Sequence, residues 1–187
     1  SKGHKVLYVS GEESESQIKN RAIRILDNIS EQVFVLSDNS LDNVLAIIQE
    51  IQPQLIIIDS IQTFTMDEYQ PSRAGSPSQT MGCANALLQV AKDPEHPRAI
   101  IIVGQMTKDD ELAGVRALEH LVDAVLVIEA DSGEDLRALT VDKNRFGSAG
   151  EIGFFNITDK GMISIDNPSE YFMTVRENDA QVSGAAL

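Results

Sequence analysis

The chain has little cysteine, little positive charge and no tryptophan. Its one cysteine, Cys83, cannot form an internal disulfide, and no Cys/His cluster has the spacing of a zinc site. Cys83 falls inside an expected helix, so we expect a core residue rather than a nucleophile. The 15 Lys and Arg face 29 Asp and Glu, a formal net charge of −14. Because nonspecific nucleic-acid binding depends on clustered Lys and Arg, any DNA contact must be local or created by assembly.

Long hydrophobic runs are also missing. The longest, residues 55–58 and 99–103, are far shorter than the ~20 residues that cross a bilayer. The first residues do not resemble a secretory signal, so we expect a cytoplasmic protein with no membrane contact. A composition of 42% hydrophobic and 24% charged residues is typical of a folded domain. We expect one domain over residues 1–175 and a flexible tail over 176–187, which is small and polar.

Short apolar runs alternate with amphipathic stretches in the first part of the chain. Strands are expected at 6–10, 33–36, 55–59 and 99–103. Helices are expected after Ser14, after the N-cap Ser40, and from about Ser78 to Lys92. This alternation indicates βαβ units and a parallel sheet. Residues 64–79 form a loop long enough to suggest function or mobility, and residues 105–115 form a second polar loop.

The later part of the chain has a different pattern. A short helix is expected at 117–121, followed by strands at 124–128, 136–141, 152–155 and 162–165 that glycine-containing turns connect. Such turns favour antiparallel hairpins. The predicted fold class is therefore α/β, a mostly parallel sheet flanked by helices, with antiparallel strands toward the C-terminal end.

Two acidic motifs follow expected strands. Asp59 ends an apolar strand and precedes Ser60, at the sheet edge where α/β proteins bind ligands. A carboxylate followed by a hydroxyl suits Mg²⁺ on nucleotide phosphates, although an Asp in this place is often a simple turn residue. Glu12 and Glu13 follow the first strand and could orient a water if the two strands are neighbours. The alternative is that both lie in the first turn of the following helix, where they favour the helix dipole.

A third motif is basic. Lys143 and Arg145 flank Asn144 at the end of a strand, just before Gly147. Two cations on a rigid strand end suggest an anionic partner, such as a phosphate reached across a subunit interface. The alternative is a solvated turn with Phe146 packed inward.

These motifs occur together in a recognisable combination. They are Tyr8–Ser14, Leu55–Thr63 and Lys143–Gly147. Together they closely resemble the bacterial RadA/Sms DNA-repair ATPases, a branch of the RecA-like superfamily. The resemblance covers roughly Lys5 to Met173, and the Lys143–Gly147 string is highly specific.

The resemblance implies a RecA-like ATPase core in the bacterial cytoplasm. Such a core assembles as a homo-oligomeric ring, a hexamer, binds single-stranded DNA beside a recombinase, and uses ATP and Mg²⁺ for branch migration or helicase-like work. By this resemblance Glu12 polarises the attacking water with Glu13 beside it, although either glutamate could be the activating one. Asp59, followed by Ser60, is the Walker B aspartate acting through Mg²⁺. Gln105 senses the γ-phosphate.

The remaining family positions are basic. By resemblance, Lys143 and Arg145 lie near the subunit interface, the nucleotide and DNA. The loops 64–79 and 106–115 would face DNA, with Arg73, Lys108 and Arg116 as the available cations.

The chain departs from the family pattern at two positions and in several features that it lacks. The family commonly has His where Gln105 stands and Pro where Val115 stands. No Gly-x-x-x-x-Gly-Lys-Ser/Thr phosphate loop occurs, and that loop supplies most of the grip on phosphates. The family's zinc finger and protease-like C-terminal domain are missing as well. We therefore expect a piece of a longer ATPase that is inactive alone and binds nucleotide poorly.

Two other hypotheses fit parts of the sequence. The chain could be a non-catalytic RecA-like assembly or binding module, as the missing phosphate loop would allow. It could also be a relative of the circadian KaiC type, which shares a Glu-Glu strand end, but the Lys143–Gly147 string argues against that.

Overall fold

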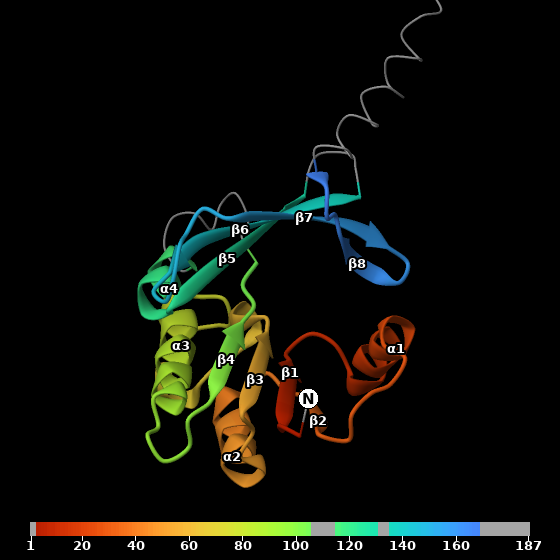
Figure 1. Cartoon of the computed structure of the whole chain (residues 1–187). Helices are drawn as coiled ribbons and strands as arrows, with labels where there is room; N and C mark the ends of the chain where they lie inside the picture. Colours follow the sequence, from red (N-terminus) through yellow and green to blue (C-terminus); the bar gives the residue numbers. More distant parts are fainter. Residues whose placement is uncertain (1–2, 106–114, 131–134, 169–187) are drawn as a thin grey trace, which may run out of the picture. The chain divides into compact units, whose positions relative to one another are not determined.

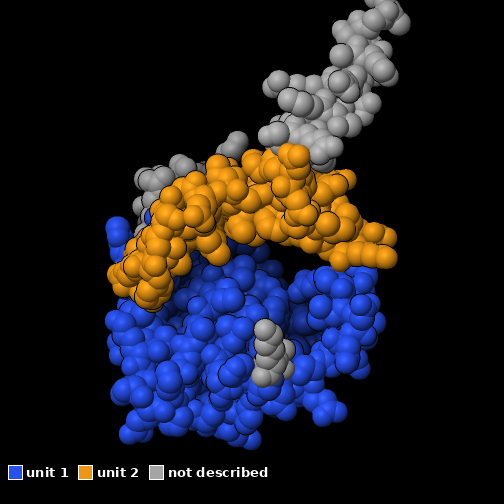
Figure 2. Space-filling view, viewed as in Figure 1, with its two compact units in different colours: residues 1–122 blue, residues 123–187 orange. Residues whose placement is uncertain are grey.

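The computed structural model describes residues 3–105, 115–130 and 135–168. The chain forms two compact units, residues 1–122 and residues 123–187, which Figure 2 draws in blue and orange. The expected tail at 176–187 lies outside the described residues. Among the described helices, none is long and apolar enough to cross a membrane.

The first unit contains a four-stranded sheet. Its strands are β1 (Val6–Ser10), β2 (Val33–Ser37), β3 (Leu55–Asp59) and β4 (Ala99–Ile102), in the order β2-β1-β3-β4. All three pairings are parallel, as the alternation of strands and helices predicts. Every strand therefore ends at the same edge of the sheet, so residues that follow β1, β3 and β4 come close together (Figure 1).

The described residues of this unit include four α-helices. They are α1 (Glu15–Ile25), α2 (Leu41–Ile51), α3 (Pro77–Ala91) and α4 (Val115–Leu121). Ser14, Ser40 and Ser76 cap the first three by accepting a hydrogen bond from a backbone N–H in the first turn. Helix α3 starts slightly earlier than Ser78 because Ser76 caps it and Pro77 suits the first helical position.

The two faces of the parallel sheet are unequal. Leu7, Val9, Ile56 and Ile58 form one face, here called the core face, and are buried in a cluster with side chains of α2, α3 and α4. Burying each such side chain contributes about 1.5–3 kcal/mol. Because side chains alternate along a strand, Tyr8, Ser10, Ile57 and Asp59 share the opposite face, the site face.

Helix α1 is held more loosely than the helices on the core face. Its one buried residue is Ile18, whereas Ile23, Ile25 and the C-cap Leu26 are exposed. A hydrogen-bonded capping box at Ser14 and Gln17 defines where the helix begins. The start of α1 is therefore set by local polar contacts more than by packing.

The segment 64–79 is anchored at both ends. It contains the short 3-10 helix η2 (Asp67–Tyr69) and a cis Gln70–Pro71 peptide. The buried Gln79 side chain accepts a hydrogen bond from the Met66 N–H (2.8 Å) and donates to the carbonyls of Met66 and Ser72 (both 3.1 Å). One amide side chain thus satisfies three backbone groups of the segment.

The second unit is an antiparallel sheet, as the glycine-containing turns predict. Its strands are β5 (Ala124–Ala130), β6 (Leu136–Asn144), β7 (Ile152–Thr158) and β8 (Gly161–Ser164), paired in chain order. All pairings are antiparallel. Gly161 closes the last hairpin with a φ of 105°, a left-handed conformation that favours glycine.

Candidate functional site

The ends of β1 and β3 form the centre of the candidate site. Ser10 and Asp59 are register partners in the parallel pair, so both lie at the end of the site face. The peptide between Asp59 and Ser60 is cis. The chain leaves β1 and β3 at this edge of the sheet, where the polar side chains of the site lie.

The turn after β1 is held by Ser10 and requires Gly11. The buried Ser10 hydroxyl accepts hydrogen bonds from the N–H groups of Glu12 (3.3 Å) and Glu13 (3.0 Å). The Gly11 N–H donates to the Asp59 carbonyl (3.0 Å). A Cβ at Gly11 would lie 2.0 Å from Oγ1 of Thr63, so only glycine fits this approach.

The structure brings Glu12 together with Ser60. The Ser60 hydroxyl donates to Oε1 of Glu12 at 3.3 Å, although the two residues are 48 positions apart. Ser60 is buried and Glu12 is exposed. The two strand-end motifs therefore meet, as their placement on neighbouring strands predicts.

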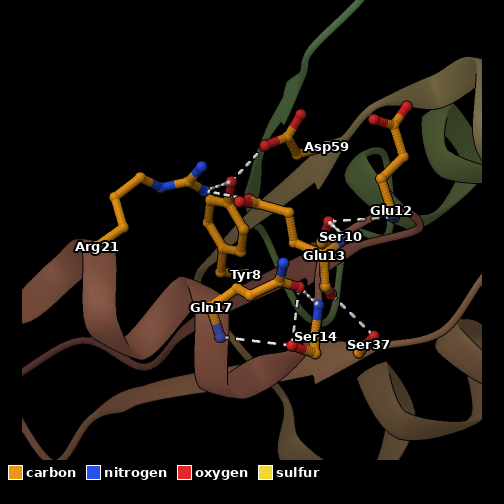
Figure 3. A network of polar contacts seen from close by, with 9 residues as sticks. All are labelled: Tyr8, Ser10, Glu12, Glu13, Ser14, Gln17, Arg21, Ser37 and Asp59. Atoms are coloured by element: carbon orange, nitrogen blue, oxygen red, sulfur yellow. Dashed lines mark hydrogen bonds and ion pairs between the residues drawn. The ribbon is translucent and has the colours of Figure 1, made fainter.

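A second chain of contacts joins Glu13 to Asp59 (Figure 3). Oε2 of Glu13 pairs with the Arg21 guanidinium at 2.6 Å, and Arg21 donates to the Tyr8 hydroxyl at 3.1 Å. The Tyr8 hydroxyl in turn donates a short hydrogen bond to Oδ2 of Asp59. Burial, and then the bond to Asp59, raise the pKa of Tyr8 from 10 to about 12. The phenol is thus a proton donor at neutral pH.

The structure corrects one alternative for the glutamates. Glu12 and Glu13 precede α1, and the acidic residue of its first turn is Glu15. The Ser14 cap ends the turn before the helix starts, so the two glutamates lie in the turn between β1 and α1. The carbonyl of Glu13 accepts a hydrogen bond from the Ser37 hydroxyl (2.9 Å), which ties this turn to the end of β2.

Gln105 lies just beyond β4, the strand next to β3. The Gln62 side chain holds its backbone: Nε2 of Gln62 donates to the Gln105 carbonyl (2.7 Å), and the Gln105 N–H donates to Oε1 of Gln62 (3.4 Å). Gln62 belongs to the short 3-10 helix η1 (Ile61–Thr63) that follows Asp59. A change in the backbone at Gln105 would therefore act directly on the segment after Asp59.

The expected DNA-facing cations fall in different parts of the chain. Arg73 is exposed in the segment between η2 and α3. Lys108 lies outside the described residues, as does the side chain of Arg116 in α4. The role of these three residues stays a prediction.

Lys143 and Arg145 belong to the second unit. Lys143 lies in β6, and Arg145 follows the strand and pairs with Asp123 at 2.9 Å. The Asn144 side chain orders the turn by accepting from the Phe146 N–H (3.0 Å) and donating to the Ser148 carbonyl (3.2 Å). The turn is exposed, as the alternative of a solvated turn expects, but Phe146 is not packed inward, because this side chain is 83% exposed.

Comparison with known proteins finds relatives that align over nearly the whole chain. The chain is 43% identical over 182 residues to the DNA repair protein RadA of Streptococcus pneumoniae, which covers 97% of the chain and 42% of that protein. It is 42% identical to RadA of Rickettsia bellii over 98% of the chain and 40% of that protein. Over nearly its full length, the chain is homologous to part of these RadA proteins. It spans about two fifths of the length of these relatives.

The fold of this RadA homologue also matches a solved structure. The crystal structure of the RadB recombinase aligns with a TM-score of 0.59 and 18% identity, covering 88% of this chain and 80% of that one. The RecA-like fold expected from the sequence motifs is thereby confirmed. The scan against protein-family models found no match.

The oxygen atoms of this site are of the type that Mg²⁺ binds. Asp59, Ser60 and Glu12 offer oxygen donors, which a hard cation prefers. No group of three or more acidic, His or Cys residues in the described part of the chain could hold a metal alone. Mg²⁺ is commonly bound by one or two carboxylates plus substrate phosphates, and Asp59, Ser60 and Glu12 would supply the protein oxygen atoms of such an arrangement.

Sequence reasoning missed three residues that organise the site: Tyr8, Ser10 and Arg21. Tyr8 and Ser10 alternate with the core residues of β1, a pattern that marks them as sharing the opposite face with Asp59. Arg21 is three positions after Ile18, the buried residue of α1, and its sequence position alone does not reveal its contact with Tyr8.

Proposed function

We propose that the chain is the part of a DNA-repair ATPase core that activates water and coordinates Mg²⁺, working inside a longer RadA-type protein. One observation carries this proposal: the Glu12 carboxylate and the Asp59-Ser60 strand end meet at the carboxyl edge of two neighbouring parallel strands. This is where α/β proteins place nucleotide phosphates. The relatives are named as DNA repair proteins, which supports a role in DNA repair.

The roles of the residues follow from their positions. Asp59 and Ser60 would hold Mg²⁺ bound to ATP, and that ion would neutralise charge on the phosphates. Glu12, exposed and in contact with the Ser60 hydroxyl, would orient and deprotonate the attacking water. Gln105, tied through its backbone to the segment after Asp59, would report the state of the γ-phosphate to that segment.

The basic residues supply the proposed contacts with DNA. Arg73, Lys108, Arg116 and Lys143 would touch single-stranded DNA, while Lys143 and Arg145 would also reach nucleotide across a subunit interface of a ring. In a chain with a net charge of −14, a DNA path requires these cations to be grouped locally, within one copy or by assembly of several copies. A recombinase would be the partner on the same DNA.

The direct test is ATP hydrolysis with and without single-stranded DNA, by this chain and by the chain extended upstream through a native phosphate-binding loop. We expect only the extended chain to hydrolyse ATP, and we expect its rate to be higher when DNA is present. Hydrolysis by neither protein would overturn the ATPase proposal and favour the non-catalytic assembly module.

A pair of variants tests the role of Glu12. In the extended protein, Glu12→Gln should keep ATP binding and lower the hydrolysis rate about 10²-fold or more, because it removes a positioned base. Glu15→Gln, in the first turn of α1, is the matched control and should hydrolyse ATP at the normal rate. A normal rate in Glu12→Gln would indicate that Glu13, and not Glu12, acts as the base.

A further inference from the structure

The Asp59 carboxylate has a fixed partner that no motif assigns. Tyr8 and Asp59 come from neighbouring strands, and both lie on the site face of the sheet. The phenol hydroxyl donates its proton to Oδ2 of Asp59. One carboxylate oxygen is thereby engaged, which restricts rotation of the carboxylate and favours the other oxygen, Oδ1, for coordination.

Arg21 extends this contact to helix α1. Its guanidinium donates to the Tyr8 hydroxyl at 3.1 Å and pairs with Glu13 at 2.6 Å. A phenol that receives a hydrogen bond from a cation is a better donor to a carboxylate, because successive hydrogen bonds polarise one another. Glu13, in turn, is bound to a cation of the helix, whereas Glu12 contacts the Ser60 hydroxyl.

We propose that Tyr8 and Arg21 are positioning residues that orient the Asp59 carboxylate for Mg²⁺ and retain Glu13 beside α1. This inference deepens the proposed ATPase function and rests on it. Tyr8 acts directly on Asp59, and Arg21 acts through Tyr8. Arg21 and Glu13 are 40% and 32% exposed, so solvent weakens their ion pair, and Arg21 contributes less than Tyr8.

The first test uses this chain alone and needs no ATP. The chain has three tyrosines, and subtracting the ultraviolet resonance Raman spectrum of Tyr8→Phe from that of the unchanged chain isolates Tyr8. At neutral pH the ring bands of Tyr8 should be those of a phenol that donates a hydrogen bond to a carboxylate. Asp59→Asn should shift these bands toward those of a weaker donor, because a neutral amide oxygen is a weaker acceptor than a carboxylate. Arg21→Met should produce a smaller shift, since it removes the hydrogen bond that the Tyr8 hydroxyl accepts.

A Tyr8 spectrum that shows no strong hydrogen-bond donor, and that Asp59→Asn does not change, would overturn the contact, and with it the inference. This result does not depend on whether the protein hydrolyses ATP. Tyr8→Phe keeps the ring and removes only the hydroxyl, so it should fold, which circular dichroism can verify.

The second test measures the Mg²⁺ dependence of ATP hydrolysis by the extended protein. Tyr8→Phe should raise the Mg²⁺ concentration for half-maximal rate about 10-fold, as loss of an outer-shell partner commonly does. The rate at saturating Mg²⁺ should change less. Arg21→Lys should lie between Tyr8→Phe and the unchanged protein, because it keeps a cation without the planar guanidinium. Tyr69→Phe, a phenol packed over Gly82, is the matched control.

The outcomes separate the two proposals. An active Tyr8→Phe protein with normal Mg²⁺ dependence overturns the positioning role and leaves the ATPase proposal intact. An unchanged extended protein that does not hydrolyse ATP overturns the ATPase proposal, and the positioning role for Mg²⁺ with it. A loss of rate in Tyr8→Phe that saturating Mg²⁺ does not restore also contradicts positioning through Asp59.

Discussion

The core face and the site face of the parallel sheet are made by the same strands and differ in what covers them. Ile56 and Ile58 are fully buried under α2 and α3, whereas their neighbour Ile57 is only partly buried and Ile101 of β4 is 51% exposed. Among the described helices, α1 is joined to the site face by the hydrogen bond from Arg21 to Tyr8, and it buries a single residue. Alternation along a strand therefore separates two tasks: the core face supplies stability, and the site face carries the polar groups.

The largest expected effect comes from comparing adjacent isoleucines of β3. Ile58→Ala should lower the free energy of unfolding by about 2–5 kcal/mol, because it removes buried methyl groups and leaves a cavity. Ile57→Ala, one residue away on the site face, should cost less than half of that. Urea unfolding of both variants measures the difference. Equal costs would mean that the site face is packed as well as the core face.

The next effect concerns Gln79, which with Thr80 is one of two buried polar side chains of α3. Gln79→Leu should lower the free energy of unfolding by about 2–4 kcal/mol, since buried backbone groups of Met66 lose their partner. Proteolysis should then cut residues 64–79 sooner. Ser78→Ala, on the exposed side of the same turn, is the control and should behave normally. An uncut, fully stable Gln79→Leu protein would show that water replaces the amide.

A smaller effect is expected where β1 ends. Gly11→Ala should cost about 1–3 kcal/mol, because the new methyl group overlaps Thr63 and the turn carrying Glu12 must shift. Thr63→Ala removes the nearest atom, so the double variant should be more stable than the sum of the single effects predicts. Unfolding measurements on all four proteins complete the cycle. Additive effects would mean that the cost of Gly11→Ala does not come from the overlap with Thr63.

The smallest effect separates the helices of the two faces. Ser14→Ala and Ser40→Ala each remove an N-cap, which costs about 1 kcal/mol. Because α2 packs into the core, Ser40→Ala should lower global stability. Ser14→Ala should instead raise amide hydrogen exchange mainly within α1. Exchange that increases across the whole first unit in Ser14→Ala would show that α1 is coupled to the core.

The sequence predicts the fold well because the decisive signals are local. Apolar runs mark the four parallel strands, and Ser14 and Ser40 mark two helix starts within one or two residues. Asp59 and Glu12 could be proposed together because parallel strands end at one edge. The Tyr8 and Arg21 contacts depend on how α1 lies over the sheet, which no local pattern encodes. The expectation that Phe146 packs inward is wrong because an aromatic side chain is usually buried, and the turn formed by Asn144 overrides that tendency.

The single cysteine has a practical consequence for experiments on this molecule. Cys83 is completely buried, and burial raises its pKa to about 11, so little of the reactive thiolate exists at neutral pH. A cysteine introduced on the surface would therefore react with a fluorescent or spin label far faster than the native thiol. The slow rate at which Cys83 itself is labelled would measure how often α3 opens, so the unaltered chain already carries a probe of local unfolding.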